Sequence, residues 1–301
     1  MYLKQRRKEK SILVTGSSGL VGETLIRTLG KRKMKVVGCD IKNPSKENFI
    51  FEKCNLVSEK EVLRLFQKYS FTQVIHLAAY IKSGNLSPIE RKKIFQANIV
   101  ATFNLVAAMG ENKIKRIIFP SSMTVYGLPQ YLPVDENHPL NPLDFYGLSK
   151  VVAEEIIKNS NINYFIVRFP GIFAFNRKEG AIYNFISKAL KEEDIHISAK
   201  SSTPWDVIFI EDVIKSIITS LPSEIENNIV NIGYGEPIEL TTLAKKIVKL
   251  CNSHSKVIED YSVTHPIFYL STKKAENLLG FNPPSLDLRL HQFIDFFKHE
   301  K

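Results

Sequence analysis

One stretch near the start of the chain decides the fold: Ser11-Ile-Leu-Val-Thr-Gly-Ser-Ser-Gly-Leu-Val-Gly-Glu-Thr-Leu-Ile-Arg-Thr-Leu29. It begins with a short apolar run, Ile12 to Val14, of the kind that forms a strand buried on both faces. A turn with Gly16, Gly19 and Gly22 follows, and apolar residues then recur at helical spacing up to Leu29. The stretch therefore predicts a strand, a glycine turn and a helix.

This arrangement is the one that a dinucleotide needs. Gly16 allows a tight turn, Gly19 lets a pyrophosphate approach the backbone, and Gly22 lets the helix pack closely on the strand. The phosphates then lie at the positive end of the helix. A glycine-rich turn that binds nothing is the alternative for such spacing alone.

A second predicted strand, Lys35 to Cys39, supports the dinucleotide interpretation. It ends in Asp40, close to the offset of about 20 residues expected for the acid that accepts the ribose hydroxyls. Because a carboxylate repels a 2′-phosphate, the sequence predicts NAD in preference to NADP. The positive charge of Lys42 nearby favours the 2′-phosphate of NADP instead.

The composition is that of a soluble globular protein, and the length is sufficient for a full α/β core. The chain has 301 residues, of which 44% are hydrophobic, and it shows neither an apolar run of about 18 residues nor the apolar core of a signal peptide. The three cysteines, Cys39, Cys54 and Cys251, are scattered without metal-like spacing. We therefore expect a cytoplasmic protein with buried or incidental thiols, no metal and no membrane association.

The formal net charge of +10 is partly local. Residues 1–10 are predicted to form a disordered basic arm, which contains Lys4, Arg6, Arg7, Lys8 and Lys10. The remaining positive charge is spread thinly, without a basic stripe interleaved with aromatic residues. We expect no nucleic-acid partner, and an anionic small substrate explains the charge more simply.

Strands and helices alternate from Ser11 to Phe169, which predicts a doubly wound parallel sheet with helices on both faces. Beyond Pro170 the alternation weakens. The prediction is an NAD-binding Rossmann-type domain at 11–170 and a smaller α/β substrate lobe at 171–301, interleaved with the last sheet strands. Predicted strands cover 12–14, 35–39, 73–79, 115–119, 164–169, 207–210 and 229–232. Predicted helices cover 59–68, 89–110, 146–159, 182–190, 214–221, 241–250 and 288–297.

The segment Tyr146-Gly-Leu-Ser-Lys150 places a phenol and an ammonium four residues apart on one helix face. An ammonium near a phenol lowers the pKa of the phenol. Such a tyrosine can exchange a proton with a sugar or alcohol hydroxyl. The spacing is common by chance, but here it follows a dinucleotide turn, and Ser122 stands at the carboxyl end of the preceding predicted strand.

These pieces occur together in one order, and the sequence resembles the extended short-chain dehydrogenases/reductases of the NAD-dependent epimerase/dehydratase family. The resemblance extends from Ser11 to about Pro284. The matching pieces are Thr15–Gly22, Asp40, His76–Ala79, Asn98, Ser121–Gly127, Tyr146-x-x-x-Lys150, Arg168–Gly171, Asp206–Val213, Asn231–Gly233 and Lys274–Gly280.

The resemblance implies roles for individual residues. Tyr146 would be the acid/base, Ser122 would hydrogen-bond the reacting oxygen, and Lys150 would hold the nicotinamide ribose and tune Tyr146. The implied cofactor contacts are Gly16, Ser18, Gly19, Leu20, Val21, Gly22, Asp40, Asn55, Leu56, Leu77, Ala78, Ala79, Asn98, Tyr146, Lys150 and Phe169. The implied substrate contacts are Lys82, Ser122, Thr124 and Trp205.

Structural roles are the alternative for three of the matching residues. His76 is expected to be a satisfied core histidine, and Ser121 is expected to be structural. Asn98 has the alternative of bonding neighbouring backbone. Asn55 stands where the family usually has an aspartate that contacts adenine, and an amide oxygen can still accept that bond.

The residues after Ser122 restrict the reaction. Dehydratases of the family resemble one another in an Asp-Glu pair here, whereas this chain has Met123-Thr124. Neither side chain can both donate and accept a proton at neutral pH in that way, and the Glu of the family's decarboxylases is absent too. An NAD-dependent nucleotide-sugar epimerase is predicted first, a sugar dehydrogenase or ketoreductase second, and a non-catalytic dinucleotide-binding protein last.

The substrate side departs from the family pattern. Trp205 stands where the nucleotide-sugar enzymes have an arginine for the diphosphate, so a bidentate guanidinium is missing there. Ala181 replaces an asparagine that often opens a helix of the smaller lobe. Residues that could contact a diphosphate instead are Arg177, Lys178, Lys188 and Lys200. The resemblance also implies a homodimer, formed by pairing the helices at 89–110 and 146–159.

Overall fold

The computed structural model describes residues 9–46, 49–175, 177–198, 206–222, 224–260 and 267–299. Most of the predicted basic arm, together with Trp205 and Lys200, lies outside these residues. Lys10 is described and begins the first strand. Within the described residues, no helix combines the length and apolar character needed to cross a membrane.

The chain divides into two compact units whose segments alternate along the sequence. The first unit comprises the chain up to Val125 together with Pro142–Val167 and Ser220–Ile229. The second comprises Tyr126–Asn141, Arg168–Thr219 and the chain from Val230 onward.

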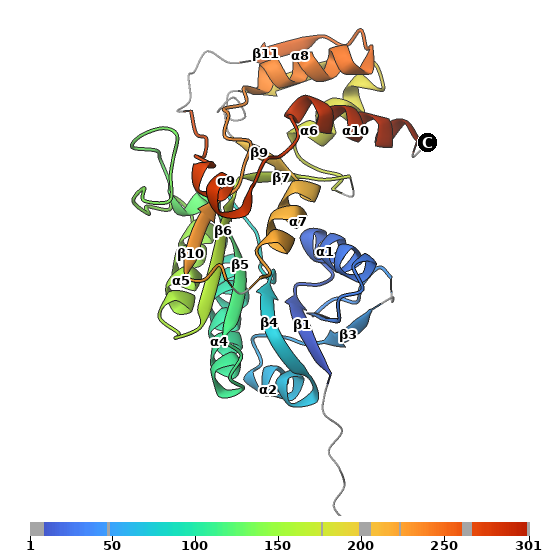
Figure 1. Ribbon diagram of the computed structural model, residues 1–301. Helices are drawn as coiled ribbons and strands as arrows, with labels where there is room; N and C mark the ends of the chain where they lie inside the picture. The colour runs from blue at the N-terminus through green and yellow to red at the C-terminus, as the bar shows by residue number, and fades with distance from the viewer. Residues whose placement is uncertain are drawn as a thin grey trace, which may run out of the picture. The chain divides into compact units, whose positions relative to one another are not determined.

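A seven-stranded sheet organises the first unit, with the strand order β3-β2-β1-β4-β5-β6-β10 (Figure 1). Pairing is parallel between β3 and β2, β2 and β1, β1 and β4, and β4 and β5. The strands are β1 (Lys10–Thr15), β2 (Val36–Asp40), β3 (Ile50–Lys53), β4 (Ser70–His76), β5 (Arg116–Ser122), β6 (Asn163–Phe169) and β10 (Asn228–Asn231). This order is the doubly wound arrangement that places ligands at the carboxyl ends of the strands.

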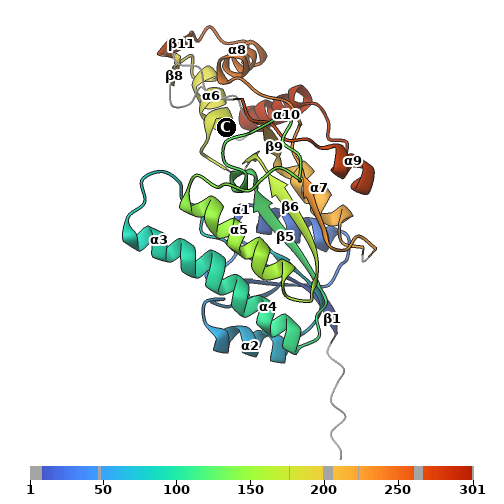
Figure 2. The same ribbon diagram turned by 90° about the vertical axis from the view of Figure 1, so that its left-hand side faces the viewer.

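Helices cover both faces of this sheet. Figure 2 shows α2, α4 and α5 on the face toward the viewer and α1 behind the sheet. The helices of the unit are α1 (Leu20–Lys31), α2 (Glu59–Lys68), α3 (Pro88–Ile94), the π-helix η1 (Phe95–Val100), α4 (Ala101–Glu111), the 3₁₀ turn η2 (Met123–Val125) and α5 (Phe145–Lys158). The single predicted helix at 89–110 is thus α3, η1 and α4 in succession.

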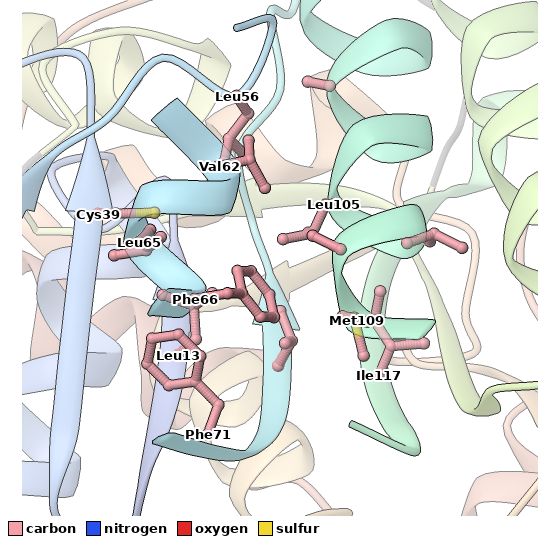
Figure 3. Packing of buried hydrophobic residues seen from close by; sticks show 14 of the residues in the cluster. Leu13, Cys39, Leu56, Val62, Leu65, Phe66, Phe71, Leu105, Met109 and Ile117 are labelled. Carbon is pink, nitrogen blue, oxygen red and sulfur yellow. The ribbon is translucent and has the colours of Figure 1, made fainter. Parts of the chain in front are cut away.

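The core of the first unit lies between the sheet and the helices α2 and α4 (Figure 3). Leu13 of β1, Phe66 of α2, Leu105 of α4 and Ile117 of β5 are all at least 96% buried. The rings of Phe66 and Phe71 meet edge to face with their centroids 5.2 Å apart. This packing holds β1 and β4, which carry the glycine turn and the loop after His76, in a rigid relation.

The second unit contains two small parallel sheets, β7 with β9 and β8 with β11. Its strands are β7 (Gly171–Phe173), β8 (Ile195–Ser198), β9 (Val207–Phe209) and β11 (Val257–Asp260). Its helices are α6 (Ala181–Ala189), α7 (Ile210–Thr219), α8 (Leu240–Cys251), α9 (Lys273–Leu279) and α10 (Leu286–His299). Three of its strands and α9 were not predicted, because segments of three to seven residues carry too little periodicity.

The prediction of a strand at 73–79 was wrong by three residues, since β4 spans Ser70–His76. Ser70 pairs with Lys10 and His76 pairs with Thr15 of β1. Leu77, Ala78 and Ala79 therefore lie beyond the end of the strand. This shift places them at the sheet edge where a ligand binds.

We expect Leu65→Ala to lower the free energy of unfolding by about 2–5 kcal/mol, because it leaves a cavity in a packed core. Leu65 of α2 is 4% exposed. The adjacent Arg64 is exposed, so Arg64→Ala should change the free energy of unfolding by no more than about 0.5 kcal/mol. Chemical denaturation of both variants tests the packing, and equal effects would contradict it.

Candidate active site

The turn between β1 and α1 brings three backbone segments into close approach. Gly16 has a φ of +66°, and a Cβ built on it would lie 2.6 Å from the backbone nitrogen of Ala78. A Cβ on Gly22 would lie 2.2 Å from the carbonyl oxygen of Gly16. Any larger residue at either position must therefore push the turn away from β4 or α1.

The start of α1 presents backbone N–H groups at this turn. The first hydrogen bond of the helix runs from the N–H of Glu23 to the carbonyl oxygen of Gly19, over 2.9 Å. The N–H groups of Leu20, Val21 and Gly22 precede that bond and belong to the orphan donors of a helix start. Such donors, with the helix dipole, suit the phosphates of a dinucleotide.

A cavity of about 290 Å³ adjoins the turn within the first unit. Its lining residues are Gly16, Ser18, Gly19, Cys39, Asp40, Ile41, Lys42, Cys54, Asn55, Leu56, Val57, Leu77, Ala78, Ala79, Tyr80, Ala97 and Ala101. Predicted cofactor contacts that do not line it are Leu20, Val21, Gly22, Asn98, Tyr146, Lys150 and Phe169.

Several lining residues were missed by the sequence reasoning. Cys39, Ile41 and Lys42 flank Asp40 in the sequence, so the predicted acid could have indicated them. Ala97 and Ala101 come from η1 and α4, and no local pattern marks them. Small side chains at these two positions leave room for the cavity.

Asp40 is held rigidly at the wall of this cavity. Its Oδ2 accepts a hydrogen bond from the N–H of Ser18 over 3.1 Å, and its Oδ1 accepts one from the N–H of Lys42 over 3.0 Å. The Ser18 hydroxyl donates to the carbonyl oxygen of Lys42 over 2.8 Å. Because each carboxylate oxygen has a further lone pair, Asp40 keeps capacity to accept from ribose hydroxyls.

The two predicted amide contacts have partners inside the protein. Asn98 is buried, its Oδ1 accepts from the N–H of Tyr80, and its Nδ2 donates to the Tyr80 carbonyl and the Ser149 hydroxyl. Through its bonds to the backbone of Tyr80, the Asn98 side chain therefore fixes the loop that follows β4. The Oδ1 of Asn55 accepts from the N–H of Val57 over 3.1 Å.

Tyr146 lies in the first turn of α5 and is 9% exposed. Asp144 caps this helix, because its Oδ1 accepts from the N–H of Gly147 over 2.6 Å. A Cβ on Gly147 would lie 2.6 Å from the carbonyl oxygen of Thr124. The absence of that Cβ thus lets the turn that carries Tyr146 pack against η2, directly after Ser122.

Ser122 and Thr124 are hydrogen-bonded to each other. The N–H of Thr124 donates to the Ser122 hydroxyl oxygen over 3.2 Å, and the Thr124 hydroxyl donates to the same oxygen over 3.0 Å. A hydroxyl oxygen has two lone pairs and one proton. Both lone pairs of Ser122 are used by Thr124, which leaves the Ser122 proton available to an acceptor outside this pair.

Lys150 is buried one turn further along α5. Its Nζ donates to the carbonyl oxygen of Pro120 over 2.8 Å and lies 4.4 Å from the centroid of the Phe119 ring. Burial lowers the pKa of Lys150 to about 8, and the negative charge of Glu154 opposes that shift. Glu154 is itself buried and accepts the Ser121 hydroxyl over 2.5 Å.

The expected lowering of the Tyr146 pKa is wrong for this structure. Burial raises the pKa of the Tyr146 phenol, and the negative charge of Asp144 raises it further. The phenol is nearly enclosed, so loss of water around the charged form disfavours the phenolate. The Tyr146 phenol is thus uncharged at neutral pH in this structure.

His76 has the structural position that the sequence predicted. It is 1% exposed, with its Nδ1 2.7 Å from the Thr15 hydroxyl and its Nε2 3.0 Å from the Thr102 hydroxyl. Because Thr102 donates its proton to the carbonyl oxygen of Asn98, this network assigns the histidine proton to Nε2. Burial lowers the pKa of His76 to about 3, so the ring is neutral.

Lys82, predicted to contact substrate, lies 3.8 Å from a carboxylate oxygen of Glu90 and is half exposed. Among the residues that the structure describes, no group of three or more His, Cys, Asp or Glu side chains could hold a metal ion. The first unit therefore has two candidate parts of an active site. One is the cavity beside the glycine turn, and the other is the set of polar side chains Ser122, Thr124, Tyr146 and Lys150.

A model of the NAD-dependent epimerase/dehydratase family matches residues 12–233 of this chain. The chain belongs to that family. It is accordingly an NAD-dependent enzyme of the extended short-chain dehydrogenase/reductase type, and its cofactor is NAD. The glycine turn, the start of α1 and the carboxylate of Asp40 together fit an NAD molecule in the cavity of the first unit.

Two curated relatives and a solved structure match the chain over most of its length. A Methanocaldococcus jannaschii protein named "Putative UDP-glucose 4-epimerase" is 34% identical, covering 92% of this chain and 94% of its own length. A dTDP-4-dehydro-6-deoxyglucose reductase of Escherichia coli is 29% identical, covering 92% and 93%. The Thermotoga maritima UDP-glucose 4-epimerase, crystallised with UDP-glucose, superposes with a TM-score of 0.85 at 22% identity, covering 97% of this chain and 99% of its own.

We expect His76 to make the protein sensitive to acid. The unfolded chain takes up a proton at His76 near pH 6.5 and the folded chain only near pH 3, so stability falls as the pH drops through this window. The slope approaches about 1.4 kcal/mol per pH unit.

Unfolding by guanidinium chloride between pH 4 and 7 measures this effect. In the His76→Gln variant, the free energy of unfolding should depend less steeply on pH, by about 1.4 kcal/mol per pH unit, than in the unchanged protein. His291→Gln, which alters an exposed histidine of α10, is the matched control and should keep the original slope. Identical slopes for both variants would contradict the assignment.

Proposed function

We propose that this member of the epimerase/dehydratase family is a nucleotide-sugar epimerase with Tyr146 as its acid/base. The observation that carries the proposal is the packing of the Tyr146 turn against η2, beside Ser122, in the same unit as the NAD cavity. NAD, when bound, supplies a transient acceptor for the hydrogen of the reacting carbon. The 34% identical relative has an epimerase name.

Ser122 orients the reacting oxygen of the sugar. Its lone pairs accept from Thr124, so its own proton is directed to the substrate oxygen. The Ser122 hydroxyl donates to the sugar hydroxyl of the bound substrate. It donates to the same oxygen when that oxygen carries more negative charge during the reaction. The interaction therefore strengthens as the reaction proceeds.

Tyr146 takes and returns the hydroxyl proton. Burial and Asp144 disfavour its phenolate in the described structure, so a neighbouring positive charge is needed for proton transfer near neutral pH. Lys150 is the buried cation on the same helix, one turn away. Its pKa of about 8 keeps it protonated at neutral pH.

The nucleotide part of the substrate has a candidate site in the second unit. A cavity of about 630 Å³ is bordered by β7, α6 and β8, and Arg177, Ala181 and Lys188 are among its lining residues. Arg177 donates to the carbonyl oxygen of Ile172 over 2.9 Å and pairs with Glu179. We propose that Arg177 and Lys188 take part of the role of the missing diphosphate-binding arginine.

A sugar ketoreductase or dehydrogenase is the second candidate, because one relative that covers nearly the whole chain is named a reductase. A panel of nucleotide sugars with catalytic NAD distinguishes the two. An epimer formed without net NADH supports the epimerase, whereas NADH in proportion to product supports the dehydrogenase. Failure of every nucleotide sugar to react would contradict the proposed substrate class.

We expect Tyr146→Phe to lower kcat by about 10²–10⁴-fold, since the general acid/base is removed. The affinity for NAD should stay within about twofold, because Tyr146 does not line the cavity beside the glycine turn. Steady-state turnover and calorimetric NAD titration measure the two quantities. Tyr164→Phe on β6 is the control, and retained turnover in Tyr146→Phe would refute the mechanism.

We also propose a homodimeric, cytoplasmic enzyme. Figure 2 shows α5 beside the continuous run of α3 and α4. These helices, with η1 between α3 and α4, expose large apolar side chains. These are Ile89, Phe95, Phe103 and Leu148, with exposed fractions from 45% to 68%. Such a surface suits a second copy of the chain, and free thiols at all three cysteines suit a reducing compartment.

We expect Phe103→Glu to convert the dimer to a monomer, because it places a charge within the apolar surface of α4. Light scattering coupled to size-exclusion chromatography gives the molecular mass directly. Leu288→Glu changes a similarly exposed leucine of α10 and should leave the mass unchanged. A monomeric unchanged protein would contradict the proposed assembly.

A further inference from the structure

Another cavity of the first unit lies at the amino ends of the sheet strands. Its volume is about 780 Å³, and its walls come from the starts of β1, β2 and β3, the last turns of α1 and the end of α2. Its lining residues are Glu9, Lys10, Ser11, Ile26, Arg27, Gly30, Lys31, Met34, Lys35, Val36, Val37, Phe49, Ile50, Lys68 and Tyr69. Because β1, β2 and β3 run parallel, this cavity lies at the sheet edge opposite to the glycine turn. It shares no lining residue with the NAD cavity.

The lining of this cavity carries an excess of positive charge. Five of its side chains are cationic and one is acidic. Two of the cations are paired with carboxylates, whereas Lys10, Arg27 and Lys31 have no ion-pair partner among the residues that the structure describes. Like charges around one cavity repel one another and attract anions. The sequence does not show this grouping, because the cations come from separate elements.

Much of the remaining lining is apolar. Ile26 and Val37 are 4% and 1% exposed, whereas Ile50 is 54% exposed. The missing side chain of Gly38 lets the Phe49 ring lie against β2, since a Cβ there would be 2.5 Å from Cε2 of Phe49. A small inorganic anion would leave this apolar surface in contact with water, whereas a ligand with an apolar tail would cover it.

Gly30 of α1 keeps part of the cavity open. Glycine inside a helix is destabilising relative to alanine, and a Cβ on Gly30 would have no atom within 4 Å. Packing within the described chain therefore does not require glycine at this position. Its effect is to leave the helix surface at the cavity accessible to a ligand.

We propose that this cavity binds an anionic single-chain lipid as a monomer, with its acidic head on the unpaired cations and its tail on the apolar lining. Lys10, Arg27 and Lys31 attract the head, a phosphate or a carboxylate. The apolar surface lines a cavity and does not project from the protein, so it suits a tail that enters as a monomer more than the surface of a bilayer. The inference is independent of the reaction at Tyr146 and of the sugar that reacts.

The test titrates the full-length protein, saturated with NAD, with dodecyl phosphate below its critical micelle concentration. Calorimetry should show saturable binding that weakens with added salt, because the head pairs with exposed cations. Dodecyl maltoside has a similar tail and an uncharged head, and inorganic phosphate has no tail. Each should bind at least about tenfold more weakly, and binding of either as tight as that of dodecyl phosphate would overturn the inference.

A variant that fills the cavity locates the binding site. Gly30→Leu favours the helix and should weaken dodecyl phosphate binding by about tenfold or more, because the side chain occupies the tail's space. Gly110→Leu is the matched control. Gly110 is likewise the second-to-last residue of its helix, and a Cβ on it also has no atom within 4 Å, but it does not line the cavity. Both variants should keep their NAD affinity, and undiminished dodecyl phosphate binding by Gly30→Leu would refute the site.

A second variant tests the charge. Replacing Arg27 and Lys31 together by glutamine should weaken dodecyl phosphate binding by about fivefold, whereas Arg64→Gln on α2 should leave it unchanged. Vesicles of phosphatidylglycerol that sediment with the protein, without binding of dodecyl phosphate, would assign the cations to a membrane surface and overturn the monomer site. Failure of the protein to bind NAD would contradict the cofactor assignment only.

Discussion

The close approach of backbone at Gly16 is the constraint on which the first unit depends. A side chain at Gly16 would meet the backbone of Ala78, and one at Gly22 would meet the carbonyl of Gly16. Only glycine therefore lets β1, α1 and the segment after β4 meet at one point. Their meeting places the glycine turn and the end of β2, with Asp40, at the wall of one cavity. The proposed NAD site thus depends on a packing requirement of the sheet edge.

Helix α5 combines the chemistry of the site with the proposed assembly. Its buried face carries Tyr146 and Lys150, whereas Leu148 between them is 45% exposed. The helical period of 3.6 residues separates these faces. A partner that covered Leu148 would therefore pack on the same helix that carries the proposed acid/base, Tyr146.

Burial sets the proton chemistry of this unit. Lys150 and His76 both have lowered pKa values because water is excluded around them, and each is hydrogen-bonded to groups on neighbouring elements. The two side chains nevertheless have different charges near neutral pH. His76 stays neutral and ties β4 to β1, whereas Lys150 remains protonated near neutral pH. Glu154 supplies the negative charge that helps Lys150 to keep its proton.

Local patterns in the sequence determined the order of strands and helices, the glycine turn, Asp40 and the Tyr146–Lys150 pair. These features depend on spacing within one element or between adjacent ones, and α2 was predicted with its observed bounds. Only the tertiary structure decided that Asn98 bonds Tyr80 and that Ala97 and Ala101 line the cavity. It also reversed the expected pKa shift of Tyr146. Each of these depends on desolvation or on contacts between segments far apart in the chain, which periodicity cannot report.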